Sequence, residues 1–341
     1  MGRTRVYITV DTECSMGGAW VHADRRPLGA DRCVFCRDGN KSYGIPFIDA
    51  ELRRFGLRAT FFCEVFAARA NGEGDVRAAT DFLSRQGHDV QLHIHPTFRH
   101  YGEWLASPER SDAGRAARSA LSDNIGSYNE VEQEQLLAEA CEIFARCTGR
   151  KPQVFRAGSY AANLATLRAL ARLGVVIDSS YNPAYAWSFP EADLEPNHVR
   201  KLEGVWELPV TVTRTGFPDT GPWKHLEISA VSFDEMCTAL ESAHESGMGH
   251  VVLVFHSFSL IKPRDIFYSQ YRFNHIVARR FRRLLGYLAI NSQKFDVSTV
   301  GRLAAEPALM KDTGAVAVPD LGWWRPPVRK LVQAVNRIYW V

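Results

Sequence analysis

One stretch organises the chain: residues 87–96, Gly-His-Asp-Val-Gln-Leu-His-Ile-His-Pro. Apolar and polar residues alternate in it, which predicts a strand, because side chains on a strand repeat with a period of two. His93 and His95 then share one face, with Cα atoms roughly 6.5 Å apart, a span from which two ring nitrogens can converge on one metal ion. Pro96 cannot continue a central strand, so the pair lies at the strand's carboxyl end. Two ordinary histidines are the alternative.

The composition is that of a globular protein. The 341 residues are 46% hydrophobic and 23% charged, which excludes disordered and fibrous classes. A net charge of +3 is too small to predict a nucleic-acid partner. The sequence has no internal repeat, so we expect one domain over residues 1–305, followed by a linker and a helix over residues 306–341.

The chain start and the cysteines predict a cytoplasmic protein. A strand begins at Arg5, which leaves no room for the charged and apolar regions of a signal peptide. No apolar run reaches the length of a membrane span. The seven cysteines are an odd number, and Cys63 lies in an apolar run, which is typical of reduced intracellular thiols.

Strands and helices alternate along the chain. This order predicts an α/β protein with a parallel sheet and right-handed crossovers, either open or closed into a barrel. Residues 97–130 lack a clear period and predict an excursion of loops and short helices above the sheet. The expected strands are 5–10, 58–64, 89–95, 153–156, 175–178, 205–213, 249–256 and 295–297, and the expected long helices are 45–56, 75–86, 129–147, 164–172, 232–244 and 273–290.

Polar side chains follow the expected strands, at the edge where α/β folds keep their chemistry. Taken singly, an acid there is more often a helix cap, and an arginine is more often part of a surface ion pair. Five strand ends that carry such groups are harder to explain as caps. The residues are Asp11, Glu13, His93, His95, Arg156, Asp178 and His256.

These residues fall within five motifs that resemble those of the NodB-homology polysaccharide deacetylases, carbohydrate esterase family four. The resemblance covers about residues 5–300 and implies a distorted (β/α)7-type barrel. It also implies a metal-dependent hydrolase that removes an N-acyl group, in the first instance acetyl, from an amino sugar. The motifs are Thr9-Val-Asp-Thr-Glu13, Gly87-His-Asp through His93-Ile-His95, Phe155-Arg-Ala-Gly-Ser-Tyr160, Ile177-Asp-Ser-Ser180 and Leu253-Val-Phe-His256.

The resemblance implies a divalent ion, with zinc as the first choice, held by Glu13, His93 and His95. Such an ion with an open position lowers the pKa of bound water to about 7 and polarises a carbonyl. Two departures from the family matter. Its first motif usually has adjacent aspartates, a base and then a ligand, whereas Asp11 and Glu13 are separated, so the assignment of these two roles stays open. Its second motif spaces two histidines four apart, and position 97 here is Thr, so His95 must supply the second ligand.

The remaining residues have catalytic roles by the same resemblance. Asp11 is expected to take a proton from water, with Arg156 orienting it. The backbone N–H of Tyr160 is expected to face the oxyanion, and His256 to protonate the leaving nitrogen. Asp178 either orients one of these partners or caps a turn.

Several alternatives stay open. His-x-His also opens amidohydrolase and phosphoesterase barrels, but there it ends the first strand, whereas here it ends the third. A deformylase acting on a related sugar is a second possibility. A non-catalytic carbohydrate-binding relative is a third, although such a protein would not need Arg156 and His256. A cytoplasmic enzyme is expected to act on a nucleotide-linked or lipid-linked glycan intermediate rather than on cell-wall polymer.

Two further segments carry separate hypotheses. Cys33 and Cys36, near Cys14 and His22, are either half of a small zinc site or ordinary loop thiols. Residues 323–341 predict a basic, tryptophan-flanked amphipathic helix. Such a helix either makes peripheral contact with an anionic membrane or docks on its own domain or on a dimer partner.

Overall fold

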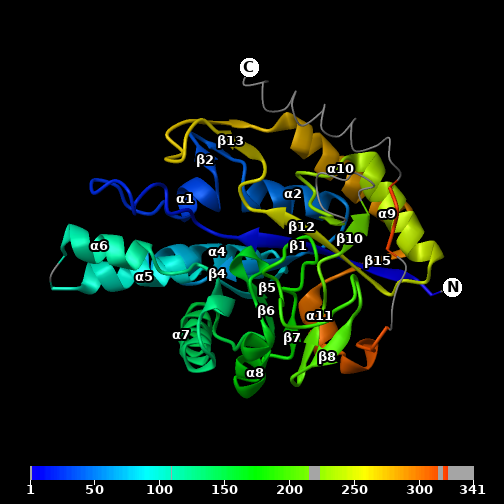
Figure 1. Cartoon of the computed structure of the whole chain (residues 1–341). Helices are drawn as coiled ribbons and strands as arrows, with labels where there is room; N and C mark the ends of the chain where they lie inside the picture. Colours follow the sequence, from blue (N-terminus) through cyan, green and yellow to red (C-terminus); the bar gives the residue numbers. More distant parts are fainter. Residues whose placement is uncertain (1, 109, 215–222, 314–317, 322–341) are drawn as a thin grey trace.

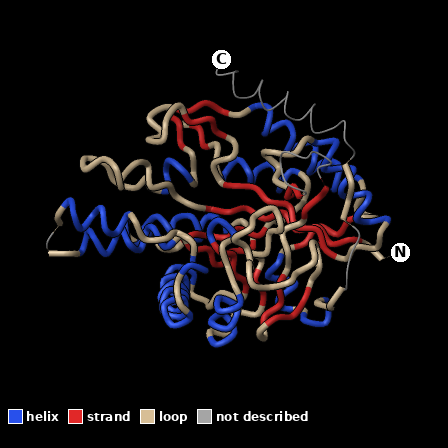
Figure 2. The backbone as a smooth tube through the Cα atoms, in the orientation of Figure 1, coloured by secondary structure: helices blue, strands red, loops and turns tan. Residues whose placement is uncertain are grey.

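A curled nine-stranded sheet forms the centre of the computed structural model (Figures 1 and 2), which describes residues 2–108, 110–214, 223–313 and 318–321. Its strand order is β12-β1-β4-β5-β6-β7-β9-β8, and β15 also pairs with β1. All these neighbours run parallel except β8 and β9. The strands are β1 (Thr4–Thr12), β4 (Thr60–Glu64), β5 (Asp89–Ile94), β6 (Val154–Ala157), β7 (Ile177–Asp178), β8 (Arg200–Leu202), β9 (Val205–Glu207), β12 (His250–His256) and β15 (Phe295–Ser298).

Three two-stranded hairpins lie outside this sheet. They are β2 (Arg37–Asp38) with β3 (Lys41–Ser42), β10 (Val212–Arg214) with β11 (Trp223–His225), and β13 (Ile261–Pro263) with β14 (Tyr271–Phe273).

Helices flank the sheet (Figure 1). Several begin at the residues that the sequence indicates: Asn129 and Ser232 each form a capping box, and Pro46 lies in the first turn of its helix. The helices are α1 (Ala30–Cys33), α2 (Ile45–Arg54), α3 (Ala67–Asn71), α4 (Glu73–Arg85), α5 (Pro96–Ala106), α6 (Asp112–Ser119), α7 (Glu130–Thr148), α8 (Leu164–Arg172), α9 (Phe233–Glu245), α10 (His275–Ile290) and α11 (Val300–Ala305), with short 3-10 turns at Ile125–Ser127, Gly158–Tyr160 and Pro307–Leu309.

The two faces of the sheet have different surroundings. Val6, Ile8 and Val10 of β1 belong to the main core cluster that the flanking helices complete. Tyr7, on the opposite face, packs in a second cluster with residues of α11. This second cluster fills one end of the curled sheet, so the polar residues Thr9 and Asp11, further along the same face, lie above an apolar floor.

The structure confirms the α/β class and the curled, barrel-like parallel sheet. The excursion over residues 97–130 contains α5 and α6. The single strand expected over residues 205–213 is wrong. Residues 205–207 pair with β7, whereas residues 212–214 leave to pair with β11. Pro209 lies between them and cannot donate a ladder hydrogen bond.

The described residues cover only part of the expected C-terminal segment, residues 306–341. The amphipathic helix expected over residues 323–341 lies outside the described residues. Among the residues that are described, no helix is long and apolar enough to cross a membrane.

Candidate active site

The parallel register brings the predicted residues to one edge of the sheet. Asp11 at the end of β1 lies beside His256 at the end of β12. Likewise, His93 on β5 lies beside Arg156 on β6. The carboxyl ends of these four strands thus surround one hollow, as the α/β fold predicts.

This hollow is a pocket of about 220 Å³. Residues from several strands and loops line it: Asp11, Glu13, His93, His95, Ala157, Ser159, Tyr160, Tyr185, Trp187, His225, Glu227 and His256. Six of the eight residues singled out from the sequence line the pocket. The other two do not line it: Arg156 lies behind Asp11, and Asp178 lies away from the lining.

Three of the lining residues form a group that could hold a metal ion. Ligand atoms of Glu13, His93 and His95 all lie within 4.8 Å of one another. Oε2 of Glu13 lies 2.8 Å from Nε2 of His95 and 3.3 Å from Nε2 of His93. Nδ1 of His93 lies 2.8 Å from the carbonyl oxygen of Arg156, which can only accept, so Nδ1 carries the proton and Nε2 keeps its lone pair for an ion. The donor set of two imidazoles and one carboxylate suits zinc and related divalent ions.

Electrostatics support the same assignment. Burial alone would raise the pKa of Glu13, but the positive charge of His95 and a hydrogen bond from the same ring hold that pKa well below its usual range. Burial would lower the pKa of His95, yet Asp123 and Glu13 raise it well above the ordinary value. In the metal-free protein, His95 therefore holds a proton that a bound cation would displace.

Asp11 and Arg156 form a buried ion pair next to this group. Nη1 of Arg156 donates to Oδ1 of Asp11 over 2.7 Å and to Oγ1 of Thr9 over 2.9 Å. Nε of Arg156 donates to the carbonyl of Ser179, and the guanidinium lies 4.2 Å from the ring centre of Phe62. The arginine side chain is fully buried. These contacts hold the Asp11 carboxylate in one orientation.

His256 has an acidic neighbour, Glu227, that no sequence motif indicates. Oε1 of Glu227 lies 3.8 Å from Nδ1 of His256, whose Nε2 lies 4.0 Å from Oδ2 of Asp11. Glu227 is anchored in turn by Nε2 of His225, 3.3 Å away, and by the hydroxyl of Ser229. Burial would raise the pKa of Glu227, but hydrogen bonding to His225 and the charge of His256 lower it to about 2. His225 and Glu227 come from a stretch without periodicity, so no pattern in the sequence could have found them.

The turn after β6 brings Tyr160 into the pocket. Ser159 and Tyr160 both have left-handed backbones, with φ of 53° and 58°. Non-glycine residues rarely adopt this conformation, and such strain concentrates at functional sites. The Tyr160 hydroxyl is buried without a hydrogen-bond partner among the described residues, and its ring stacks on Tyr185, which stacks on Trp187. These rings form an aromatic wall on one side of the pocket.

Asp178 lies away from the pocket lining. Its carboxylate accepts a hydrogen bond of 2.6 Å from the hydroxyl of Ser180, two residues on, and pairs with Glu207 on the neighbouring strand. Burial raises the pKa of both acids, so the pair shares a proton. Of the two roles expected for Asp178, this contact favours the turn cap.

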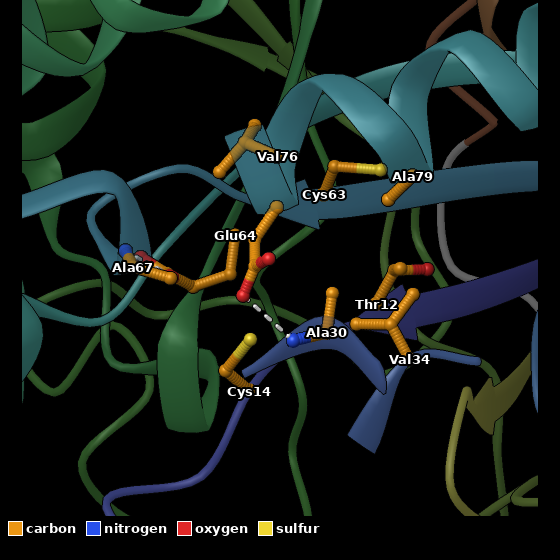
Figure 3. A pocket seen from close by; sticks show the side chains of 10 residues that line it. Thr12, Cys14, Ala30, Val34, Cys63, Glu64, Ala67, Val76 and Ala79 are labelled. Carbon is orange, nitrogen blue, oxygen red and sulfur yellow. Dashed lines mark hydrogen bonds between the residues drawn. The ribbon is translucent and has the colours of Figure 1, made fainter. Parts of the chain in front are cut away.

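The cysteine hypothesis gains no support. Among the described residues, the group with three possible metal ligands contains neither Cys33 nor Cys36. Burial raises the pKa of both thiols, to about 12 for Cys33, which disfavours the thiolate that zinc needs. Cys14 lines a separate small cavity with Glu64 (Figure 3). That cavity has a volume of about 10 Å³, room for one water at most.

The curled sheet with its flanking helices has the fold of solved polysaccharide deacetylases. A Mycobacterium smegmatis protein assigned as a polysaccharide deacetylase aligns over 93% of this chain and 94% of its own, with 18% identity and a TM-score of 0.53. A family 4 carbohydrate esterase from Streptomyces lividans, solved with acetate, aligns over 94% of this chain and 100% of its own, with 12% identity and a TM-score of 0.44. A family 4 pseudoenzyme from Bacillus anthracis aligns over 89% of this chain and 66% of its own, with 9% identity and a TM-score of 0.44. No protein-family model and no curated protein matches the sequence.

Proposed function

We propose that this protein is a metal-dependent deacylase that hydrolyses the N-acyl amide, in the first instance an acetamide, of an amino sugar. One observation carries the proposal: the metal-ligand group of Glu13, His93 and His95 shares a pocket with the Asp11–Arg156 ion pair and with His256. Amide hydrolysis needs an activated water, a stabilised oxyanion and a proton for the leaving amine. The pocket contains a candidate group for each requirement.

Glu13, His93 and His95 would hold the ion. When bound, a divalent cation supplies Lewis-acid activation of water and of the acyl carbonyl. We assign the base to Asp11, because Arg156 holds its carboxylate in place while Oδ2 stays directed to the pocket side, where it faces His256. His256 would deliver a proton to the leaving nitrogen, and the carboxylate of Glu227 would keep its ring oriented.

Tyr160 would bind the developing oxyanion. The left-handed backbone at this residue presents the turn to the pocket, and the backbone N–H is the expected donor. The unpartnered hydroxyl of the same residue is a second possible donor. Burial raises the pKa of Tyr160 well above its ordinary value, so this hydroxyl keeps its proton at any working pH.

The size and lining of the pocket also support a proposal for the substrate. A pocket of about 220 Å³ with an aromatic wall suits one sugar ring and its acyl group. A sugar carried on a nucleotide or on a lipid remains our first choice of substrate, in keeping with the cytoplasmic location expected from the sequence. A deformylase would use the same groups, because formyl and acetyl amides differ only in the acyl substituent.

Acid release from a defined set of substrates tests the proposal. The full-length protein, supplied with Zn²⁺, would be incubated with a free N-acetyl amino sugar, its nucleotide-linked and lipid-linked forms, a chitin oligomer and the matching N-formyl sugars. We expect acetate release that Asp11→Asn abolishes and Glu245→Gln, an exposed change on α9, leaves intact. Formate release alone would make the protein a deformylase. Sugar binding by calorimetry without release of either acid would favour the non-catalytic relative.

A further inference from the structure

Asp123, a carboxylate outside the five motifs, contacts His95 on the side of the ring that faces away from the other two candidate metal ligands. Oδ2 of Asp123 lies 2.6 Å from Nδ1 of His95, on the side of the ring opposite Glu13. The other oxygen of Asp123 accepts a hydrogen bond of 2.9 Å from the backbone amide of Thr97, in the first turn of α5. Asp123 therefore joins the loop after α6 both to the His95 ring and to the helix that begins beside it.

Two more contacts restrict the same ring. A Cβ atom on Gly158 would lie 2.6 Å from Cε1 and 2.7 Å from Nδ1 of His95, so the ring packs directly against the glycine backbone. Oε1 of Glu64 accepts a hydrogen bond of 3.4 Å from the backbone amide of His95. These two contacts restrict the position of the His95 ring. Asp123 then fixes the rotation of the ring and determines which ring nitrogen carries the proton.

We propose that Asp123 is the positioning residue that lets His95 serve as a metal ligand although it follows His93 by two residues rather than four. A carboxylate can only accept from Nδ1–H, which leaves the lone pair on Nε2, facing Glu13 and His93. His93 obtains the same control from the carbonyl of Arg156. Mutation of such a partner behind a ligating histidine typically lowers metal affinity by about 10- to 100-fold. The inference rests on the metal-dependent function proposed above.

The variant Asp123→Asn tests this role. Its amide oxygen can still accept from Thr97, but its NH₂ group donates to Nδ1 of His95 and moves the ring proton to Nε2, where it blocks the ligand atom. We expect Zn²⁺ affinity, measured by competition with a chelator, to fall about 10- to 100-fold, while circular dichroism shows that the metal-free variant keeps its fold. The matched control is Asp112→Asn, an exposed carboxylate on α6 that pairs with Arg115, and it should bind Zn²⁺ as the wild type does.

A double-mutant cycle covers the case in which Asp123→Asn also weakens the fold. If Asp123 acts through His95, the change should cost no further Zn²⁺ affinity in a His95→Ala background, whose weak residual binding is titrated with free Zn²⁺ in excess. An equal loss in both backgrounds overturns the inference, as does an Asp123→Asn affinity within about twofold of the wild type. If the wild type itself binds no Zn²⁺, the proposed function fails first and the inference fails with it.

Discussion

Arg156 holds Asp11 by a hydrogen bond of 2.7 Å from Nη1 to Oδ1, and the arginine side chain has no exposure to solvent. The same guanidinium donates to Thr9 and to Ser179, so its planar fork is satisfied on several sides at once. A buried carboxylate and a buried guanidinium depend on each other, because either one alone would carry an uncompensated charge.

The first prediction concerns that pair. Arg156→Ala leaves the buried Asp11 carboxylate without its cation and should lower the free energy of unfolding by about 3–5 kcal/mol. Arg156→Lys keeps the charge but cannot reproduce the fork, so it should fold better than the alanine variant and still lose most activity. Urea denaturation measures the free energy of unfolding of both variants. Arg168→Ala, which removes a half-exposed partner of Glu130, is the control and should cost about 1 kcal/mol or less. Equal stability of all four proteins would contradict this account.

The second prediction separates the two acids of the first motif. Asp11→Asn should bind metal normally and hardly turn over, since a base is needed only for proton transfer. Glu13→Gln should lose metal, because it removes one of three ligands. Metal content and kcat, measured on the same preparations, distinguish the two. The opposite pattern would exchange the two roles.

The third prediction concerns the residue beside His256. Glu227→Gln removes the negative charge 3.8 Å from Nδ1 of His256. We expect kcat to fall about 10- to 100-fold, with KM and metal content little changed, because the loss affects proton delivery rather than binding. A steady-state comparison with Glu245→Gln checks it. Wild-type turnover in Glu227→Gln would show that His256 needs no such partner.

The fourth prediction concerns pH and lies outside the site. Burial lowers the pKa of His250 to about 4, and its Nδ1 lies 3.0 Å from the hydroxyl of Tyr7. In the unfolded chain the histidine pKa is about 6.5. Between about pH 4 and that value, the unfolded chain therefore binds more protons at His250 than the folded protein does. Stability should therefore be complete above that range and fall as pH drops toward 4, by about 2–3 kcal/mol at pH 4.5.

Chemical denaturation at pH 7 and pH 4.5 measures this change. His250→Asn, which cannot titrate in this range, is the comparison. Between pH 7 and pH 4.5 its loss of stability should be smaller than that of the wild type by about 2–3 kcal/mol. The same loss in both proteins would mean that other groups cause the acid sensitivity.

Much of the site could be predicted because it lies at strand ends. The alternation in residues 87–96 places His93 on the inner face, and the same period places Asp11, Arg156 and His256 there. Parallel pairing then brings these ends together without any further information. The order of strands and helices is likewise visible in apolar periods and in caps such as Asn129.

The rest depends on loops that carry no period. Asp123, His225 and Glu227 reach the site from segments with few regular elements, and only the folded chain shows which of many polar residues turn inward. The break near Pro209 shows a similar limit: apolar and β-branched residues on both sides predict one strand, but residues 212–214 turn away to pair with β11.

Metal content tests the central claim most directly. Elemental analysis of purified full-length protein after loading with Zn²⁺ and removal of excess should find about one ion per chain in the wild type. His93→Ala and His95→Ala should contain almost none, with unchanged circular dichroism, because the core does not depend on either ring. Full occupancy in His95→Ala would remove this residue from the ligand set. A wild type without metal would contradict the account as a whole.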